Sequence, residues 1–311
     1  ADVFVEKYIE RPKHIEVQVL GDKYGNIVHM FERDCSIQRR HQKVIEFAPS
    51  LILSEEQRQA ICEDALMIAR HVNYRSAGTV EFLVDAQGNH YFIEMNPRIQ
   101  VEHCVTEQIT GIDIVQAQIR VAQGYKLADP EIGIPTQDSI THRGYAIQCR
   151  VTTEDPANNF APDTGTIEVY RSSSGHGIRL DSGNAYAGAQ ISPFYDSLLV
   201  KIVAYNRTFQ GTIDTAIRCL HETKIKGVKT NIGFLINVLN HPRFRNGECD
   251  TSFIAQTPEL FDIHGGDNME KKMLTFLANK AVNEIRGEKP EFNELEVPTF
   301  DKPLLLRGTK Q

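Results

Sequence analysis

A row of alternating polar residues lies between positions 94 and 102. Every even position carries a functional group and every odd position an apolar residue or proline, in the order Glu94, Met95, Asn96, Pro97, Arg98, Ile99, Gln100, Val101, Glu102. Side chains at alternate positions of an extended backbone point to one face. That face would present a carboxylate, an amide, a guanidinium, another amide and another carboxylate. Such a set suits a metal ion and anions better than it suits water.

The alternation by itself is typical of a half-buried strand with a solvated front. Pro97 argues against a central strand, because proline lacks the amide donor of a sheet ladder. A fully extended row would also span roughly 26 Å between its ends, too far for a metal and an anion to react with each other. We therefore expect the chain to bend at Pro97 and its neighbours.

Two strands, Thr79–Asp85 and His90–Met95, are predicted to form a hairpin around a glycine-containing turn. Glu81 and Glu94 interrupt these otherwise apolar strands. Burying an unpaired carboxylate costs several kcal/mol, so such a residue is usually an edge position or a ligand. With Asn96 they offer three oxygen atoms, which suit Mg²⁺ or Mn²⁺ bound together with nucleotide phosphates. On the residues alone, a purely structural role for the pair is equally open.

The segment Asp34–Lys43 has neither helical nor strand periodicity and gathers Arg39, Arg40, His41 and Lys43. We expect a basic loop there. It would either be solvated or face phosphates or another anion.

The remaining periodicities predict a mixed fold. Strands are expected at Val3–Tyr8, His14–Leu20, Ile27–Glu32, Tyr145–Thr152, Thr166–Tyr170 and Ser197–Ala204. Helices are expected from a capping box at Ser54 and Gln57 to about His71, and at Asp113–Gln123, Thr208–Glu222 and Asn231–Leu239. A further helix within a linker is expected after Phe261. These elements divide the chain into a first domain at 1–124, a linker at 125–142, a second domain at 143–258 and a second linker at 259–311.

Composition limits the classes of partner. The chain has 311 residues, 41% hydrophobic and 24% charged, with a net charge of -7, which argues against nucleic acid or a membrane surface. No apolar run approaches the length of a membrane span. Six scattered cysteines without a C-x-x-C pair indicate buried, reduced thiols and a reducing compartment. The chain starts without methionine and is expected to be part of a longer polypeptide.

Four blocks of the sequence closely resemble the biotin carboxylase component of biotin-dependent carboxylases. They are His14–Gln18, Glu32–Lys43, Phe92–His103 and Gln148–Pro156. The resemblance implies an α+β fold, with the C-terminal portion of an ATP-grasp domain followed by the biotin carboxylase C-terminal domain. Thr257–Asp262 and Arg307–Gln311 resemble the pyruvate carboxylase branch. The amino-terminal part of the family, with its glycine-rich phosphate lid, would lie upstream of residue 1, so we expect the isolated segment neither to bind ATP tightly nor to turn over.

The same resemblance implies roles for individual residues. Those implied to contact ATP are Glu6, Lys7, Ile9, His14, Gln38 and His41, and those implied to bind Mg²⁺ or Mn²⁺ are Glu81, Glu94 and Asn96. Bicarbonate would be held by Lys43, Arg98, Gln100, Val101 and Glu102, with Glu102 as the base that deprotonates it. Attack on ATP would give carboxyphosphate. Arg150 matches the arginine that stabilises the biotin enolate, and its alternative is an ordinary ion pair with Glu154.

Partners follow from the resemblance as well. Biotin would be carried on a domain outside this chain, and a carboxyltransferase domain of the parent would pass the carboxyl group to pyruvate. A homo-oligomer is expected, tetrameric in the parent, with Ser192–Asp196 near a contact. The compartment would be the cytoplasm, or the mitochondrial matrix in a eukaryote. The alternatives are the biotin carboxylase of an acyl-CoA or urea carboxylase, an unrelated ATP-grasp ligase, and a non-catalytic assembly fragment.

Overall fold

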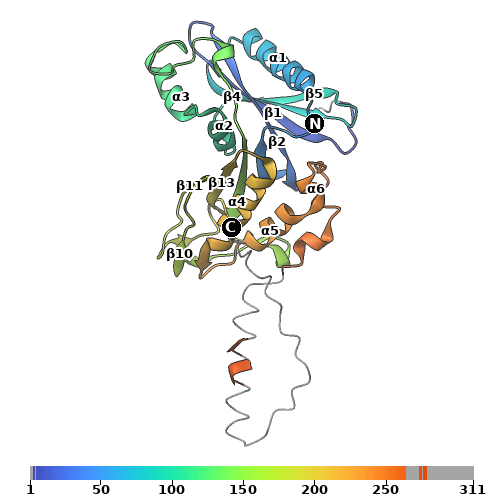
Figure 1. The fold of residues 1–311 in the computed structure, drawn as a ribbon, viewed down its shortest axis with the longest axis vertical. Coiled ribbons are helices and arrows are strands. Elements are labelled where there is room, and N and C mark those ends of the chain that lie inside the picture. The colour runs from blue at the N-terminus through green and yellow to red at the C-terminus, as the bar shows by residue number, and fades with distance from the viewer. Residues whose placement is uncertain (1–2, 4, 264–272, 275, 279–311) are drawn as a thin grey trace, which may run out of the picture. The chain divides into compact units, whose positions relative to one another are not determined.

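The computed structural model describes residues 3, 5–263, 273–274 and 276–278. The chain divides into two compact units, residues 1–263 and 264–311, and the first contains every element discussed below (Figure 1). Most of the predicted second linker, 259–311, and most of its helix lie outside the described residues. So does the Arg307–Gln311 segment.

An eight-stranded antiparallel sheet runs through the first unit in the order β11-β13-β6-β3-β2-β1-β4-β5. Its strands are β1 (Lys13–Gly21), β2 (Ile27–Arg39), β3 (Gln42–Ala48), β4 (Ser76–Val84), β5 (His90–Asn96), β6 (Tyr145–Thr152), β11 (Ile178–Ser182) and β13 (Leu198–Asn206). The shorter strands are β7 (Glu154–Asp155), β8 (Ala161–Pro162), β9 (Gly165–Thr166), β10 (Val169–Arg171), β12 (Gln190–Ile191) and β14 (Lys224–Lys226). The helices are α1 (Glu55–His71), α2 (His103–Thr110), α3 (Ile114–Gln123), α4 (Phe209–Glu222), α5 (Ile232–Asn240) and α6 (Pro242–Arg245).

Two sequence predictions are wrong. Val3–Tyr8 is not a strand where it is described, and Val5 and Tyr8 are 98% and 83% exposed. The expected loop at Asp34–Lys43 is instead the end of β2 and the start of β3, with the turn at Arg40 and His41, both at positive φ. Helix α2 and strand β11 were not predicted, and the expected strand at Thr166–Tyr170 is split between β9 and β10.

The two faces of the sheet differ in character around β1. Ile15, Val17 and Val19 pack with α1, whose capping box at Ser54 and Gln57 forms as predicted. His14, Glu16 and Gln18 alternate with them and therefore point to the opposite face. Helix α2 lies on that face, where Thr106 accepts a hydrogen bond from Arg33. The strand alternation thus separates an apolar layer under α1 from a buried polar layer.

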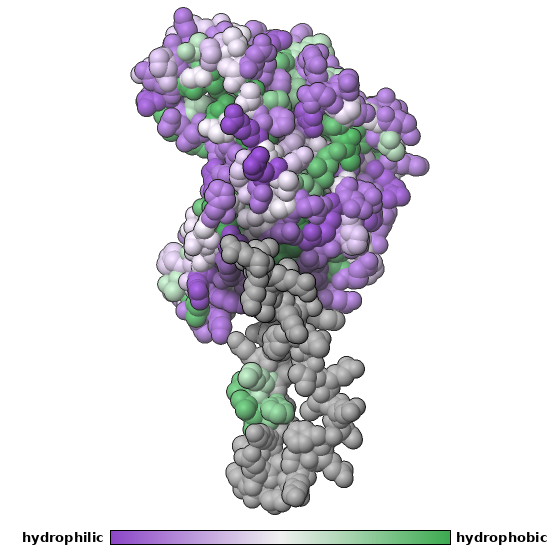
Figure 2. Space-filling model, viewed as in Figure 1, coloured by the Kyte–Doolittle hydropathy of each residue, from purple (hydrophilic) through white to green (hydrophobic). Residues whose placement is uncertain are grey.

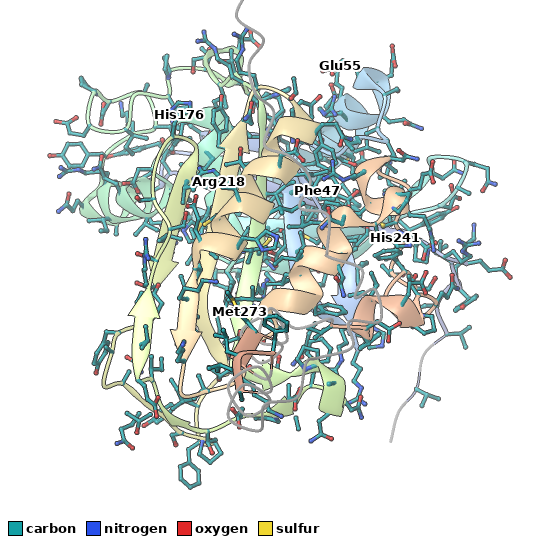
Figure 3. The ribbon with its side chains drawn as sticks, turned by 60° about the horizontal axis from the view of Figure 1, so that its bottom comes forward. Phe47, Glu55, His176, Arg218, His241 and Met273 are labelled. Carbon is teal, nitrogen blue, oxygen red and sulfur yellow. The ribbon has the colours of Figure 1, made fainter. Side chains whose placement is uncertain are left out.

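The other end of the sheet is covered by α4. Phe47 of β3, which is labelled in Figure 3, packs against Phe209 of α4 and Phe244 of α6. The ring centroids are 5.2 and 5.9 Å away. Strands β3 and β6 pair directly, Ile45 with Cys149 and Ala48 with Ala146. Elements from both sides of the predicted 125–142 linker therefore share one sheet, and the domain boundaries remain predictions.

Polar side chains predominate on the face shown in Figure 2. No helix among the described residues is both long and apolar enough to cross a bilayer. The six cysteines are all unpaired and buried, as expected.

Candidate active site

A cleft of about 1400 Å³ collects nearly all the residues singled out from the sequence. Its wall is formed by the 7–9 segment, the β2–β3 hairpin, strands β4 and β5, the 97–102 segment and β6. The predicted residues that line it are Lys7, Ile9, His14, Gln38, His41, Lys43, Glu81, Glu94, Asn96, Arg98, Gln100, Val101, Glu102 and Arg150. Glu6 is the exception: it is exposed and does not line the cleft. Long-range folding therefore unites segments that lie far apart in the chain.

Lys43 is the centre of the polar floor of the cleft. Its Nζ donates to Glu16 Oε2, to Glu81 Oε1 at 3.0 Å and to Glu102 Oε1 at 2.7 Å. Burial alone would lower the pKa of this amine, but the neighbouring carboxylates raise the pKa above its usual value. Lys43 therefore remains a cation at every physiological pH and holds three carboxylates close together.

The β4–β5 hairpin brings the predicted metal ligands together. Glu81 and Glu94 are direct cross-strand partners, and Asn96 donates its amide to both carboxylates at 3.0 Å. Burial opposes ionisation of Glu81, but a hydrogen bond from His14 and the charge of Lys43 hold its pKa at about 2. Two carboxylates and an amide on adjacent strands are a suitable donor set for Mg²⁺. Asn96 would have to rotate its amide to present oxygen, and Glu94 is exposed to the cleft.

The polar row bends as its length required. Strand β5 ends at Asn96, and Glu102 lies at the N-terminus of α2 with φ -85° and ψ 4°. Gln100 Nε2 reaches back to Glu81 Oε1 at 2.7 Å. The Glu102 end of the row contacts the Lys43 ammonium directly. The other end is linked to the same ammonium through Glu81, which accepts from Asn96 and contacts Lys43.

Two arginines occupy different environments in the cleft. Arg98 is exposed, and the one hydrogen bond its guanidinium makes among the described residues is to the Ile99 carbonyl at 3.2 Å. Arg150 is ion-paired to Glu46 and, at 3.0 Å, to Glu102. The alternative pairing of Arg150 with Glu154 does not form; Glu154 accepts from Thr152 instead. Arg98 is thus available to an anion, whereas Arg150 is held beside Glu102.

Except for Glu6, the residues expected to contact ATP line the same cleft. His14 Nε2 lies 2.8 Å from Glu81 Oε2, and its Nδ1 faces the Gln38 amide at 2.9 Å. His41 is exposed at the hairpin turn, and Lys7 donates to the Tyr91 hydroxyl at 2.9 Å. Gln38 therefore acts on this site through the orientation of His14.

The sequence reasoning missed the buried charges that support the site. Glu16 bridges Arg33 and Lys43, and Arg33 also donates to Gln18, Thr79, Gln100 and Thr106. Burial opposes ionisation of Glu16, yet the two cations hold its pKa at about 2. Glu46, fully buried, anchors Arg150. A lone carboxylate inside the apolar run Val44–Phe47 was the same signal that identified Glu81 and Glu94.

Comparisons with known proteins identify the family of the chain. Residues 1–130 match the family described as carbamoyl-phosphate synthase L chain, ATP binding domain, and residues 148–256 match the biotin carboxylase C-terminal domain. Pyruvate carboxylase of Bacillus subtilis is 56% identical over the whole chain, and the match covers 27% of that protein.

Solved structures give the same result. A complete multifunctional pyruvate carboxylase from Rhizobium etli superposes with a TM-score of 0.81 and 55% identity, over 83% of this chain and 25% of that one. The biotin carboxylase domain of Hydrogenobacter thermophilus 2-oxoglutarate carboxylase, in complex with MgADP, ADP and bicarbonate, gives 0.80 and 48%, over 84% and 56%. The chain spans about a quarter of the curated relatives it matches. It belongs to the biotin carboxylase family, with the ATP-grasp fold, and corresponds to the biotin carboxylase region of pyruvate carboxylases.

Proposed function

We propose that the cleft carries out the ATP- and bicarbonate-dependent carboxylation of biotin, as part of a pyruvate carboxylase. The observation that carries this proposal is the single ammonium of Lys43 joining the predicted base Glu102 to the predicted metal ligand Glu81. A base and a phosphate-binding metal that share one cation can act on the same pair of reactants. This is the arrangement that phosphorylation of bicarbonate requires.

Bicarbonate would lie against Arg98, whose planar guanidinium can form two parallel hydrogen bonds to it. Lys43 would add a point charge, and Gln100 and Val101 line the same wall. Glu102 would take the bicarbonate proton as one of the bicarbonate oxygens attacks the γ-phosphorus of ATP. A new P–O bond forms, the bond to the β-phosphate oxygen breaks, and the products are carboxyphosphate and ADP.

Glu81 and Glu94, with the amide of Asn96 rotated, would hold the divalent cation. When bound, Mg²⁺ neutralises charge that develops on the phosphate oxygens. The residues of the chain fix its position: Lys43 and His14 keep Glu81 ionised and oriented. Carboxyphosphate would then break into CO₂ and phosphate, and the phosphate would accept the ureido proton of biotin.

Biotin supplies the ureido nitrogen that takes up the carboxyl group. Arg150 would present its guanidinium to the ureido oxygen, where negative charge develops once the proton has left. Glu46 and Glu102 hold that guanidinium at the cleft wall. If Arg150 gave up its contact with Glu102 to bind biotin, its ion pair with Glu46 would still hold the guanidinium in place.

The carrier domain, the acceptor pyruvate, the tetrameric assembly and the reducing compartment belong to the proposal for the parent protein. Acyl-CoA and urea carboxylases would use the same cleft residues. Only the acceptor distinguishes these enzymes, and it is tested by measuring which compound sustains biotin-dependent ATP cleavage. The chain by itself is expected not to bind ATP at micromolar concentration.

The decisive experiment is bicarbonate-dependent ATP cleavage by the full-length protein that carries this chain. Glu102→Gln should lower the rate about a hundredfold or more, the usual contribution of a general base. Glu168→Gln, at an exposed position outside the cleft, is the matched control and should leave the rate unchanged. An unaffected Glu102→Gln protein would refute the assignment of the base.

The biotin step has a separate test. Free biotin should stimulate ATP cleavage by the parent, and Arg150→Ala should abolish that stimulation. Unchanged stimulation in the variant would count against the carboxylase assignment.

A further inference from the structure

A second polar cluster lies behind the 100–102 segment and has no part in the mechanism above. It consists of His103, Cys104 and Glu107 of α2, Arg179 and Asp181 of β11, and Lys201 of β13; we call it the rear cluster. None of these six residues lines the cleft. They come from three separate segments, and Lys201 lies 97 residues beyond Cys104 in the chain, so only the folded chain assembles them.

The rear cluster holds two backbone carbonyls of the polar row. Lys201 Nζ donates to the Val101 carbonyl at 3.1 Å and to Cys104 Sγ at 3.0 Å. The side chain of His103 donates through Nδ1 to the Gln100 carbonyl at 2.6 Å. Asp181, 3.3 Å from Lys201, fixes the ammonium from its other side. Two consecutive carbonyls are therefore held by side chains of one cluster.

Metal binding is the obvious competing interpretation, because ligand atoms of His103, Cys104 and Glu107 lie within 4.8 Å of one another. The charges argue against it. Arg179 pairs with Glu107 at 2.6 Å, and Lys201 already contacts the cysteine sulfur. Burial and the adjacent Asp181 carboxylate raise the pKa of the Cys104 thiol to about 12, which disfavours the thiolate that a metal needs. The cluster is an ion-pair network complete in itself.

Peptide geometry connects this network to the cleft. In a trans peptide the carbonyl and the next amide point in opposite directions. With the Gln100 and Val101 carbonyls directed into the rear cluster, the N–H groups of Val101 and Glu102 are directed away from it. Val101 and Glu102 both line the cleft. The rear cluster thus orients two adjacent amide donors toward the space in which the proposed function puts bicarbonate.

We propose that Lys201 and His103 are positioning residues for the bicarbonate subsite. They act through the two peptide planes and not by touching the substrate. This inference rests on the proposed function, since it assigns the oxyanion at the 98–102 wall to bicarbonate. Its consequence is selective: loss of either side chain weakens binding of the anion and leaves the nucleotide side of the cleft, around His14 and His41, as it was.

The test measures KM for bicarbonate and for ATP separately in the full-length protein. Lys201→Met, which keeps the length of the side chain, should raise the bicarbonate KM about tenfold, the effect of misaligning a charge-assisted anion contact. The ATP KM should stay within about twofold. Lys201→Arg should restore most of the bicarbonate affinity, because a guanidinium can still donate to the Val101 carbonyl. Lys224→Met, at an exposed position of β14, should change neither constant.

A second variant protects the test against misfolding. His103→Ala removes the side-chain contact to the Gln100 carbonyl, although the backbone N–H of residue 103 still donates to that carbonyl at 3.3 Å. It should produce the same selective rise if Lys201→Met does not fold. An unchanged bicarbonate KM in a folded variant, or equal rises in both constants, would overturn the positioning role. Failure of the proposed function is distinguishable, because the parent protein would then show no bicarbonate-dependent ATP cleavage at all.

Discussion

At the residue scale, the ammonium of Lys43 and the guanidinium of Arg98 lie in the same cleft but differ in burial and in the contacts they make. Lys43 is largely buried and contacts three carboxylates, of Glu16, Glu81 and Glu102. Arg98 is exposed and contacts only a neighbouring carbonyl among the described residues. Removing one partner of a buried ion pair leaves uncompensated charge, whereas removing an exposed cation costs little.

We therefore predict that Lys43→Met and Arg98→Met separate folding from catalysis. Lys43→Met should lower the free energy of unfolding by about 3–5 kcal/mol. Arg98→Met should change it by less than about 0.5 kcal/mol. Both should abolish bicarbonate-dependent ATP cleavage in the parent protein. Urea unfolding followed by circular dichroism measures the first pair of values, and equal destabilisation by the two variants would contradict the ion-pair network.

Acid should weaken the fold through Glu81. Its pKa is about 2 in the folded chain against 4.5 for an ordinary glutamate, so the folded state binds fewer protons between these values. The stabilisation is fully present above about pH 4.5 and is lost as the pH falls toward 2; its size is on the order of 3 kcal/mol. Urea unfolding between pH 6 and pH 3 should show this loss. Glu81→Gln should flatten the pH dependence, and Glu168→Gln should not.

At the scale of elements, alternation and capping predicted what is locally encoded. Strand β1, the β4–β5 hairpin and α1 all lie where their patterns indicated. The first half of β2 was predicted, but the part beyond Glu32 was predicted as a loop because of its polar residues Asp34, Ser36 and Gln38 and the basic cluster that follows. In the structure all three are buried, and Ser36 donates to Asp34 at 2.6 Å while Gln38 donates to the Cys35 carbonyl at 2.9 Å. Such pairing is invisible until the partners are known.

The first turn of α1 gives a quantitative prediction. Ser54 accepts from the Gln57 amide, and the Gln57 side chain accepts from the Ser54 amide. Ser54→Ala should remove the cap and lower the free energy of unfolding by about 1 kcal/mol. Gln59→Ala, at an exposed position in the same helix, should change it by only a few tenths. Chemical denaturation of the two variants side by side is sufficient, and a neutral Ser54→Ala would show that tertiary packing alone holds the helix start.

At the scale of the molecule, the sequence predicted which residues meet but not how they are held. The row from Glu94 to Glu102, Lys43 and Arg150 all line one cleft. The sequence predicted no role for the supporting carboxylates of Glu16 and Glu46, because their cation partners are distant in the chain. Ion pairs between segments depend on sheet register, and register is a property of the assembled fold.

The reactivity of the cysteines reports whether the whole fold stays closed. All six are buried, none more than 3% exposed. A thiol reagent such as dithionitrobenzoate should therefore label the native 311-residue chain slowly. In denaturant all six thiols should react at once, releasing six equivalents of thionitrobenzoate per chain. Rapid labelling of several thiols in the native chain would show that the fold opens readily.

The pairing of β3 with β6 has a mechanical consequence. Four residue pairs join these strands, from Ile45 with Cys149 to Ala48 with Ala146. The two strands thereby connect the regions matched by the two families. A hinge cannot form along this seam without breaking several ladder hydrogen bonds at once. The floor that carries Lys43 and Arg150 should thus behave as one rigid plate.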